Sequence, residues 1–327
     1  MEIRPKVSII IPVYGVEKYI ERCARSLFEQ TLDDIEFLFV DDCTPDGSIS
    51  ILKKVLNEYP FRINQVVIHR MEKNSGLTAV RQWGCEHVHG DYVIHCDSDD
   101  WIEENMLQTM YDTAVSGAFD IVFCDLFRSE GIGKSQHMVQ QVPENKINLL
   151  HDLLSGKVHG SLCNKLISRK LYNKSLAFPK DNMNEDLVLS VQLCYYAKTY
   201  KHIPVPFYHY FINSNSITQD SSNLETYLNR EYQSMRNFSI IEKFLNDKQL
   251  IQYFEVAFLQ YKIGKKVIVN KLTLLPNGWK RWREIYPEIS LMDVAVYGQG
   301  LKSKIIYLLT YFNIYKFLKN IQKKISR

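Results

Sequence analysis

The sequence predicts an α/β protein, with a mostly parallel sheet flanked by helices and a helical C-terminal region. Short apolar runs recur along the first part of the chain, beginning at residues 7, 35, 66, 92 and 121. Segments whose apolar residues have helical spacing lie between these runs. Of the 327 residues, 46% are hydrophobic and 24% are charged, which is the balance of a globular chain with a substantial core. Because strands that are apolar on both sides need cover on both faces, the alternation indicates a sheet between two helical layers.

The first part of the chain carries the expected strands and the helices between them. Apolar periodicity predicts helices around Ile20–Phe28 and Ile51–Leu56. The predicted strands are Val7–Val13, Ile35–Val40, Val66–His69, Tyr92–Cys96 and Ile121–Phe127. Ligands bind at the carboxyl ends of the strands in such sheets, so the residues directly after each strand are the first candidates for a site.

The pattern changes after about residue 128. Residues 128–160 read as a loop or a β excursion, and a region of helix and turns follows to about residue 200. Residues 203–218 look extended, but Pro204 and Pro206 limit a strand there to the edge of a sheet.

The last third of the chain is helical in pattern. From Leu224 to the end, only the neighbourhoods of Pro276 and Pro287 interrupt it. We therefore expect one domain over residues 1–223, with halves at 1–127 and 128–223, and a helical region over residues 224–327.

Cysteine usage and hydropathy place the chain in a broad class. Seven cysteines with no C-x-x-C pair favour neither a disulfide framework nor a zinc knuckle, and they suit a reducing cytosol. The N-terminus lacks the pattern of a signal peptide. The most apolar uncharged run, Ile305–Tyr315, is well below the roughly 20 residues that span a bilayer. We expect a cytoplasmic protein without a transmembrane helix and without a nucleic-acid partner.

Carboxylates follow two of the predicted strands. Asp41 and Asp42 come directly after the second strand, and Asp97, Asp99 and Asp100 come after the fourth. Carboxylates so close together repel one another unless a cation holds them, and Mg²⁺ or Mn²⁺ prefers oxygen ligands of this kind. The alternative is an acidic turn that caps the next helix.

Several motifs together resemble one protein family. The segments IIIPVYGVEKYIERCARSLFEQT, FLFVDDCTPDGS and KNSGLTAVRQWGCEHVHGDYVIHCDSDDW resemble, in order and spacing, the nucleotide-sugar half of the family 2 glycosyltransferases. The later segments CNKLISRKLY, FPKDNMNEDLVLS and FYHYFINSNSIT resemble acceptor-side segments of bacterial capsule and cell-wall members. The resemblance implies a Rossmann-like GT-A fold and an inverting sugar transfer. It makes residues 1–127 the nucleotide-sugar half and residues 128–223 the acceptor half.

The resemblance also implies a role for each motif residue. Asp42 would accept a hydrogen bond from the ring NH of the base, which favours uracil and a UDP-sugar. Asp97 would bind the ribose, and Asp97 and Asp99 would hold Mn²⁺ or Mg²⁺. The implied nucleotide-sugar contacts are Pro12, Val13, Tyr14, Asp42, Asn74, Gly76, Arg81, Asp97 and Ser98. Where the family usually has Ala-Arg-Asn, this chain has Val80-Arg81-Gln82, which keeps the charge and could alter the pocket.

Glu185 and Asp186 are the implied catalytic pair. They stand between a turn-rich loop and an apolar helical segment, and in the family the base is most often the Asp of this pair. Asp186 would take the proton from the acceptor hydroxyl as it attacks C1, and the metal would balance the charge on the departing diphosphate. For Glu185 the alternative is an acidic first turn that stabilises a helix.

The C-terminal 27 residues, 301–327, hold seven basic residues and no acid. An apolar stripe, Ile314, Phe317, Leu318, Ile321 and Ile325, faces away from a polar and basic stripe that includes Lys316, Lys319 and Lys323. The segment either lies on an anionic membrane or packs its apolar face on the protein body.

Two other functions compete with sugar transfer to a glycan or lipid-linked acceptor in surface polysaccharide synthesis. A nucleotidyltransferase would need a glycine-rich phosphate loop after the first strand, where this chain has Pro12-Val13-Tyr14-Gly15-Val16. A non-catalytic nucleotide-sugar-binding protein would be expected to lack the base or the metal-binding acids, whereas Asp186 and Asp99 are present.

Overall fold

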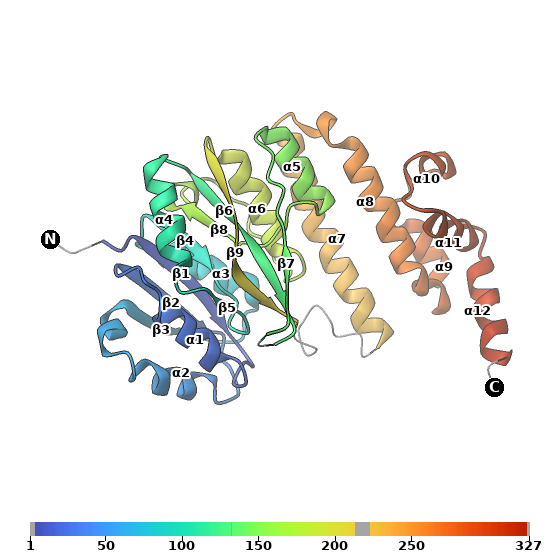
Figure 1. Ribbon diagram of the computed structural model, residues 1–327. Coiled ribbons are helices and arrows are strands. Elements are labelled where there is room, and N and C mark those ends of the chain that lie inside the picture. The colour runs from blue at the N-terminus through green and yellow to red at the C-terminus, as the bar shows by residue number, and fades with distance from the viewer. Residues whose placement is uncertain (1–3, 132, 213–222, 326–327) are drawn as a thin grey trace. The chain divides into compact units, whose positions relative to one another are not determined.

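The computed structural model describes residues 4–131, 133–212 and 223–325, and it divides into two compact units, Met1–Gln219 and Asp220–Arg327 (Figure 1). The first unit is a sheet with helices on both sides. Its strands are β1 Val7–Val13, β2 Ile35–Asp41, β3 Val66–Arg70, β4 Tyr92–His95, β5 Trp101–Ile102, β6 Ile121–Ser129, β7 Ser135–Met138, β8 Lys165–Ser168 and β9 Tyr200–Phe211. Its helices are α1 Ile20–Phe28, α2 Ser48–Leu56, α3 Leu77–His87, α4 Met106–Ser116, α5 Lys146–Ser155 and α6 Glu185–Tyr196.

The strand order explains where the parallel part of the sheet ends. The order is β3-β2-β1-β4-β8-β6-β9-β5, and β7 pairs with β6. The first four strands are parallel, as the βαβ rhythm predicted, whereas β8 runs antiparallel to both β4 and β6. The carboxyl ends of β1, β2 and β4 therefore meet at one edge, which is where the acidic segments begin.

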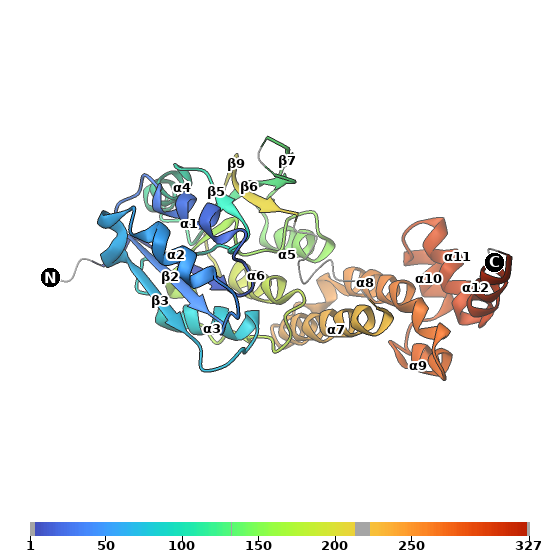
Figure 2. The ribbon, with the colours of Figure 1, turned by 90° about the horizontal axis from the view of Figure 1, so that it is seen from below.

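Alternate residues of β1 pack against helices on opposite faces of the sheet. Ile9 and Ile11 belong to a buried cluster that includes residues of α1, α2 and α4. Ile10 belongs to a second cluster, with Trp83 of α3 packed against it. Figure 2 shows α1 and α2 on one side of β1–β3 and α3 on the other. This two-sided burial is the physical reason that the strand is apolar at almost every position.

Residues 128–212 depart from the sequence prediction at β8. The region read as helix and turn contains β8, which lies in the middle of the sheet. The extended segment expected at 203–218 belongs to β9, which begins at Tyr200, and residues 213–218 lie outside the described part of the chain. β9 pairs with β6 along its length but with β5 only at Tyr208 and His209, so Pro204 and Pro206 lie where the strand is paired on one side, as an edge position requires. The pairing with β6 shifts register between Ile203 and Pro206, so the prolines lie where the ladder is already interrupted.

The second unit is helical, as predicted. Its helices are α7 Leu224–Asp247, α8 Glu255–Ile268, α9 Gly278–Glu284, α10 Leu291–Tyr297, α11 Leu301–Tyr311 and α12 Ile314–Ile325. The helical breaks near Pro276 and Pro287 are confirmed, since they lie before and after α9. Trp282 and Tyr307 are fully buried in the core of this unit. Across residues 4–131, 133–212 and 223–325, the structure has no helix with the length and apolar character needed to cross a bilayer.

Candidate active site

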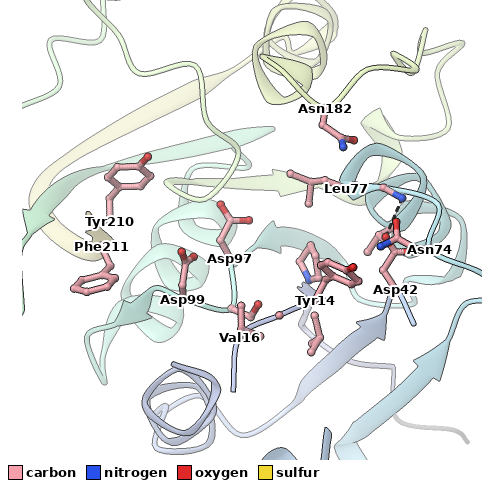
Figure 3. Close-up of a pocket in the computed structure, with 16 residues that line it drawn as sticks. Tyr14, Val16, Asp42, Asn74, Leu77, Asp97, Asp99, Asn182, Tyr210 and Phe211 are labelled. Carbon is pink, nitrogen blue, oxygen red and sulfur yellow. Dashed lines mark hydrogen bonds between the residues drawn. The ribbon is translucent and has the colours of Figure 1, made fainter. Parts of the chain in front are cut away.

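A pocket of about 340 Å³ opens at the carboxyl ends of β1, β2 and β4 (Figure 3). Asp42 and Asn74 lie at one end, and Asp97 and Asp99 lie nearer to the aromatic side chains at the other. The lining residues are Pro12, Val13, Tyr14, Gly15, Val16, Asp42, Asn74, Gly76, Leu77, Val80, Asp97, Ser98, Asp99, Asn182, Tyr210 and Phe211. Its volume and its mixture of apolar walls with a few polar groups are typical of a small-molecule site.

Asp41 and Asp42, the two adjacent acids at the end of β2, make different contacts. Asp41 accepts hydrogen bonds from the backbone N–H of Thr44 and from Arg70, which fixes the turn toward α2. Asp42 faces the pocket, and its two oxygens accept the backbone N–H groups of Ser75 at 2.7 Å and Gly76 at 2.8 Å. Each oxygen keeps a further lone pair for a ligand. Asp42 therefore joins the end of β2 to the start of α3 while remaining part of the pocket wall.

Gly76 lies at a crowded point of this wall. Its φ of +86° is in the region that favours glycine, and a Cβ at this position would lie 3.0 Å from Oδ1 of Asn182. Thr78 adds a second contact with the same segment, because its hydroxyl donates to the carbonyl of Asp181. The loop that precedes α6 is thus held against the first turn of α3.

The acidic segment after β4, residues 97–100, also contains side chains in different surroundings. Asp97, Ser98 and Asp99 line the pocket. Asp100 is buried and accepts hydrogen bonds from the Tyr208 hydroxyl at 2.6 Å and from the backbone N–H of Phe211 at 2.7 Å. Burial, followed by the charges of Asp99 and Asp97, raises the pKa of Asp100 well above its usual value. Asp100 therefore fastens the acidic loop to β9.

Arg22 of α1 supports the acidic loop from the other side. Its guanidinium donates to the backbone carbonyl of Asp99 at 2.6 Å, and it lies 3.8 Å from the ring centre of Trp101 and 4.6 Å from that of Phe211. Cations are attracted to aromatic faces in this geometry. The arrangement holds Phe211, a pocket residue, in a fixed position beside Asp99.

Arg81 lies beneath the pocket and connects the two halves of the unit. Its Nη2 bonds Asp97 at 2.8 Å, its Nε bonds Glu185 at 2.8 Å, and its Nη1 lies 3.2 Å from Nδ1 of His95. Although burial lowers the pKa of Arg81, the charges of Asp97 and Glu185 outweigh this and raise it. Arg81 is 4% exposed and is not among the residues that line the pocket, where the sequence placed it beside the base and diphosphate.

Glu185 and Asp186 begin α6 and differ in exposure. Glu185 is buried and paired with Arg81, whereas Asp186 is partly exposed and accepts the backbone N–H of Leu187. Burial, followed by the charge of Asp186, raises the pKa of Glu185 to about 7 against the opposing effect of Arg81. Glu185 is thus more than an acidic first turn, because it is an internal partner of the arginine.

Two other polar side chains are engaged in packing. The Lys165 ammonium is fully buried and donates to the carbonyls of His159 and Ser161 and to Oδ1 of Asn164. His209 lies between the rings of Trp101 and Phe127 and bonds Glu103.

The oxygen donors of the pocket suit a hard cation. Asp97 and Asp99 are carboxylates on one loop, and Arg81 occupies one oxygen of Asp97. Within the described part of the chain, no group of three or more His, Cys, Asp or Glu side chains is placed to hold a metal. Two carboxylates with phosphate oxygens from a substrate are the usual ligand set for Mg²⁺. The residues present therefore fit a cation that is shared with a diphosphate.

Most residues selected from the sequence come together in this pocket. Those that line it are Pro12, Val13, Tyr14, Asp42, Asn74, Gly76, Asp97, Ser98 and Asp99. Sequence reasoning did not select Gly15, Val16, Leu77 and Val80, which lie close to selected residues in the sequence, and it missed the more distant Asn182, Tyr210 and Phe211. The aromatic run at the end of β9 was a usable signal for the last two. Asn182 had none, because its place depends on how the loop before α6 folds over α3.

Comparison with known proteins agrees with this geometry. The family model described as glycosyl transferase family 2 matches residues 8–176. EpsH of Bacillus subtilis (strain 168) is 34% identical over 224 residues, a match that covers 66% of this chain and 63% of EpsH. The chain thus aligns with less than two thirds of that relative's length.

Two solved structures share the fold across nearly the whole chain. TarS 1–349 of S. aureus in complex with UDP-GlcNAc has a TM-score of 0.59 at 17% identity, covering 96% of this chain and 92% of that one. The mannosyltransferase PcManGT of Pyrobaculum calidifontis, in complex with GDP-Man and Mn²⁺, has a TM-score of 0.56 at 15% identity, covering 99% and 89%. These likenesses confirm the predicted GT-A-type α/β fold with a helical C-terminal region. The family model matches more than half of the residues of this chain, and the chain therefore belongs to glycosyl transferase family 2.

Proposed function

We propose that the protein is a metal-dependent, inverting glycosyltransferase that moves a sugar from a UDP-sugar to a glycan or lipid-linked acceptor in surface polysaccharide synthesis. The observation that carries the proposal is the pocket at the carboxyl ends of β1, β2 and β4, with carboxylates at both ends. We assign residues 1–223 to the transferase domain, with donor half 1–127 and acceptor half 128–223. Residues 224–327 form its helical appendage.

The donor would lie along the length of the pocket. Tyr14 is 50% exposed at the pocket, where its ring is available to a base, and Asp42 can accept a ring N–H of uracil. The family comparison supports a nucleotide-sugar, and the UDP-GlcNAc complex of TarS supports uridine. Tyr210 would then border the sugar rather than the base, because Figure 3 places it far from Asn74, whereas Asn182 lies against Gly76, the residue that bonds Asp42.

Asp97 and Asp99 would hold Mn²⁺ or Mg²⁺ against the diphosphate. A cation there would offset the negative charge that grows on the leaving group. The Mn²⁺ complex of PcManGT supports this assignment. Arg81 neutralises part of Asp97 in the absence of a substrate, so the loop is not left with uncompensated carboxylates.

Asp186 is the base that we propose. Glu185 is enclosed and paired with Arg81, which leaves Asp186 as the member of the pair that a solvent-borne acceptor can reach. Asp186 would remove the proton of the acceptor hydroxyl as its oxygen attacks C1, and the diphosphate would leave from the opposite face. A single displacement of this kind inverts the anomeric carbon and needs no covalent intermediate.

The acceptor and the location remain part of the proposal. We propose a cytoplasmic enzyme that works at the inner face of the membrane, with residues 301–327 as its contact. The basic charge of this segment supports that location, as does the lack of a membrane-spanning helix among the described residues.

The test begins with a panel of nucleotide sugars and Mn²⁺, in which slow hydrolysis identifies the donor. Asp186→Asn keeps the shape of the side chain and removes its basicity, so turnover should fall by about 10²- to 10⁴-fold while calorimetric UDP binding is unchanged. Asp112→Asn, an exposed position on α4, is the matched control and should retain full turnover. Full turnover by Asp186→Asn would remove the proposed base, and hydrolysis of no nucleotide sugar would contradict the proposed reaction.

A further inference from the structure

Helix α11 packs one side in the core of the helical unit and exposes a second, apolar stripe. Leu301, Ile305, Leu308 and Phe312 lie along one stripe and are 74%, 46%, 41% and 58% exposed. Elsewhere on the helix, Tyr307 and Thr310 are fully buried, and Tyr307 belongs to the core of the unit. A helix on the surface of a water-soluble unit normally has polar residues on the side that the core does not cover. Apolar spacing alone does not tell which side of a helix is covered, so the sequence pattern did not predict that this stripe is exposed.

The next helix repeats the pattern. In α12, Ile314, Phe317, Leu318 and Ile321 form the stripe that the sequence predicted, and they are between 39% and 64% exposed. The two helices follow one another with a short break at Phe312–Asn313. Eight large apolar side chains are therefore exposed within residues 301–321, far more than the scattered single residues of an ordinary surface.

Charge decides which partner suits this surface. The segment 301–327 carries seven basic residues and no acid. A second copy of the chain docking through the same face would bring two such segments together, and their like charges would repel. An anionic bilayer offers the opposite charge and an apolar interior at once. Exposed apolar stripes flanked by lysines are the composition that binds in the plane of such a membrane.

We propose that α11 and α12 together form a docking surface for an anionic lipid bilayer, with both apolar stripes inserted among the acyl chains. This deepens the membrane contact proposed for residues 301–327, on which it rests, by assigning the contact to the apolar stripes of both helices; the most exposed of these side chains is Leu301 of α11. The observations that carry it lie in the helical unit alone. Vesicle binding and sugar transfer can therefore fail independently.

Sedimentation of the full chain with vesicles tests the surface. We expect binding to phosphatidylcholine vesicles that contain one third phosphatidylglycerol, weaker binding at high salt, and little binding to pure phosphatidylcholine. The α11 variant carries Leu301→Ser, Ile305→Ser, Leu308→Ser and Phe312→Ser. Because these side chains are exposed, its thermal unfolding should match wild type, and its vesicle partition coefficient should fall at least about tenfold.

The control removes equally exposed side chains in a different electrostatic setting. Met292 and Val296 on α10 are 71% and 60% exposed, but Asp293 lies between them. Met292→Ser with Val296→Ser should bind vesicles as wild type does, and donor hydrolysis should be unchanged in both variants. Equal vesicle binding by the α11 variant and wild type would overturn the proposal. A wild-type dimer in sedimentation velocity that the α11 variant abolishes, without vesicle binding, would identify a second copy as the occupant instead.

Discussion

Replacing Glu185 by glutamine isolates the effect of a buried carboxyl on stability. Glu185 is 4% exposed, and burial raises its pKa from 4.5 to about 7. The folded protein therefore binds a proton at this group between these two pH values, whereas the unfolded chain has already lost it. Stability from this group is highest below the lower value and falls as pH rises toward 7. Glutamine cannot titrate, so the variant lacks this dependence.

The expected size follows from the shift. One pKa unit corresponds to about 1.4 kcal/mol, so a rise of this size makes the wild type lose roughly 2 to 3 kcal/mol between about pH 5 and pH 8 that the variant does not lose. From about pH 5 to about pH 8, the free energy of unfolding of Glu185→Gln should therefore rise by that amount relative to that of the wild type. Since the charge of Asp186 contributes to the rise, the effect should shrink in an Asp186→Asn background.

Urea unfolding of the full chain at about pH 5 and about pH 8, followed by far-UV circular dichroism, gives the free energy of unfolding of the variant and of the wild type. At each pH, subtracting the wild-type value from the variant value cancels the contributions that both proteins share. The change in this difference between the two pH values is the predicted effect. A difference that stays constant within about 0.5 kcal/mol would mean that Arg81 keeps Glu185 ionised throughout. A change in favour of the wild type would reverse the sign of the reasoning, because it would show that the ion pair lowers the pKa.

Four further changes probe the pocket, the core of the first unit and, as a control, helix α8. Asp99→Ala should abolish the Mn²⁺-dependent part of UDP binding, and equal calorimetric affinities of the wild type in Mn²⁺ and in EDTA would remove the metal assignment. Asp42→Ala should weaken UDP binding by roughly 1 to 3 kcal/mol, through loss of the base contact and release of the start of α3; unchanged affinity would show that the carboxylate does not face the base. Gly84→Ala would place a Cβ 2.5 Å from Cγ2 of Ile10, so thermal and urea unfolding should show a loss of about 1 to 3 kcal/mol. Gly264→Ala in α8, which meets nothing within 4 Å, should instead gain about 0.5 to 1 kcal/mol, and a similar loss in both variants would refute the packing argument.

The sequence predicted the strands of residues 1–127 well for a physical reason. Strands β1, β2 and β4 are buried on both faces, so they appear as continuous apolar runs, and the residues after them necessarily share one edge. β8 was not predicted because it is only four residues long and begins with the charged residue Lys165. The ammonium of Lys165 donates to backbone carbonyls, and the sequence pattern does not reveal such contacts. β9 begins before the predicted extended segment, and its register shift near Pro206 leaves no trace in the sequence.

The site was predictable where function depends on a residue's place after a strand. Asp42, Asp97 and Asp99 meet that condition and line the pocket. Arg81 is different, because the length of its side chain and the packing of α3 decide which carboxylates it reaches. The same holds for Asn182, which reaches the pocket only through the fold of a distant loop.

The bridge from Asp97 through Arg81 to Glu185 constrains how the sequence can drift. The three residues come from separate segments; Arg81 and Glu185 are buried, whereas Asp97 is partly exposed at the pocket. Loss of one partner from a buried ion pair typically costs about 3 to 5 kcal/mol, a large fraction of the stability of most domains. A lineage that changes Arg81 alone would leave two carboxylates without their cation, whereas a neutral residue at 185 leaves Arg81 paired with Asp97. We therefore expect Arg81 to be replaced, where it is replaced at all, together with its partners.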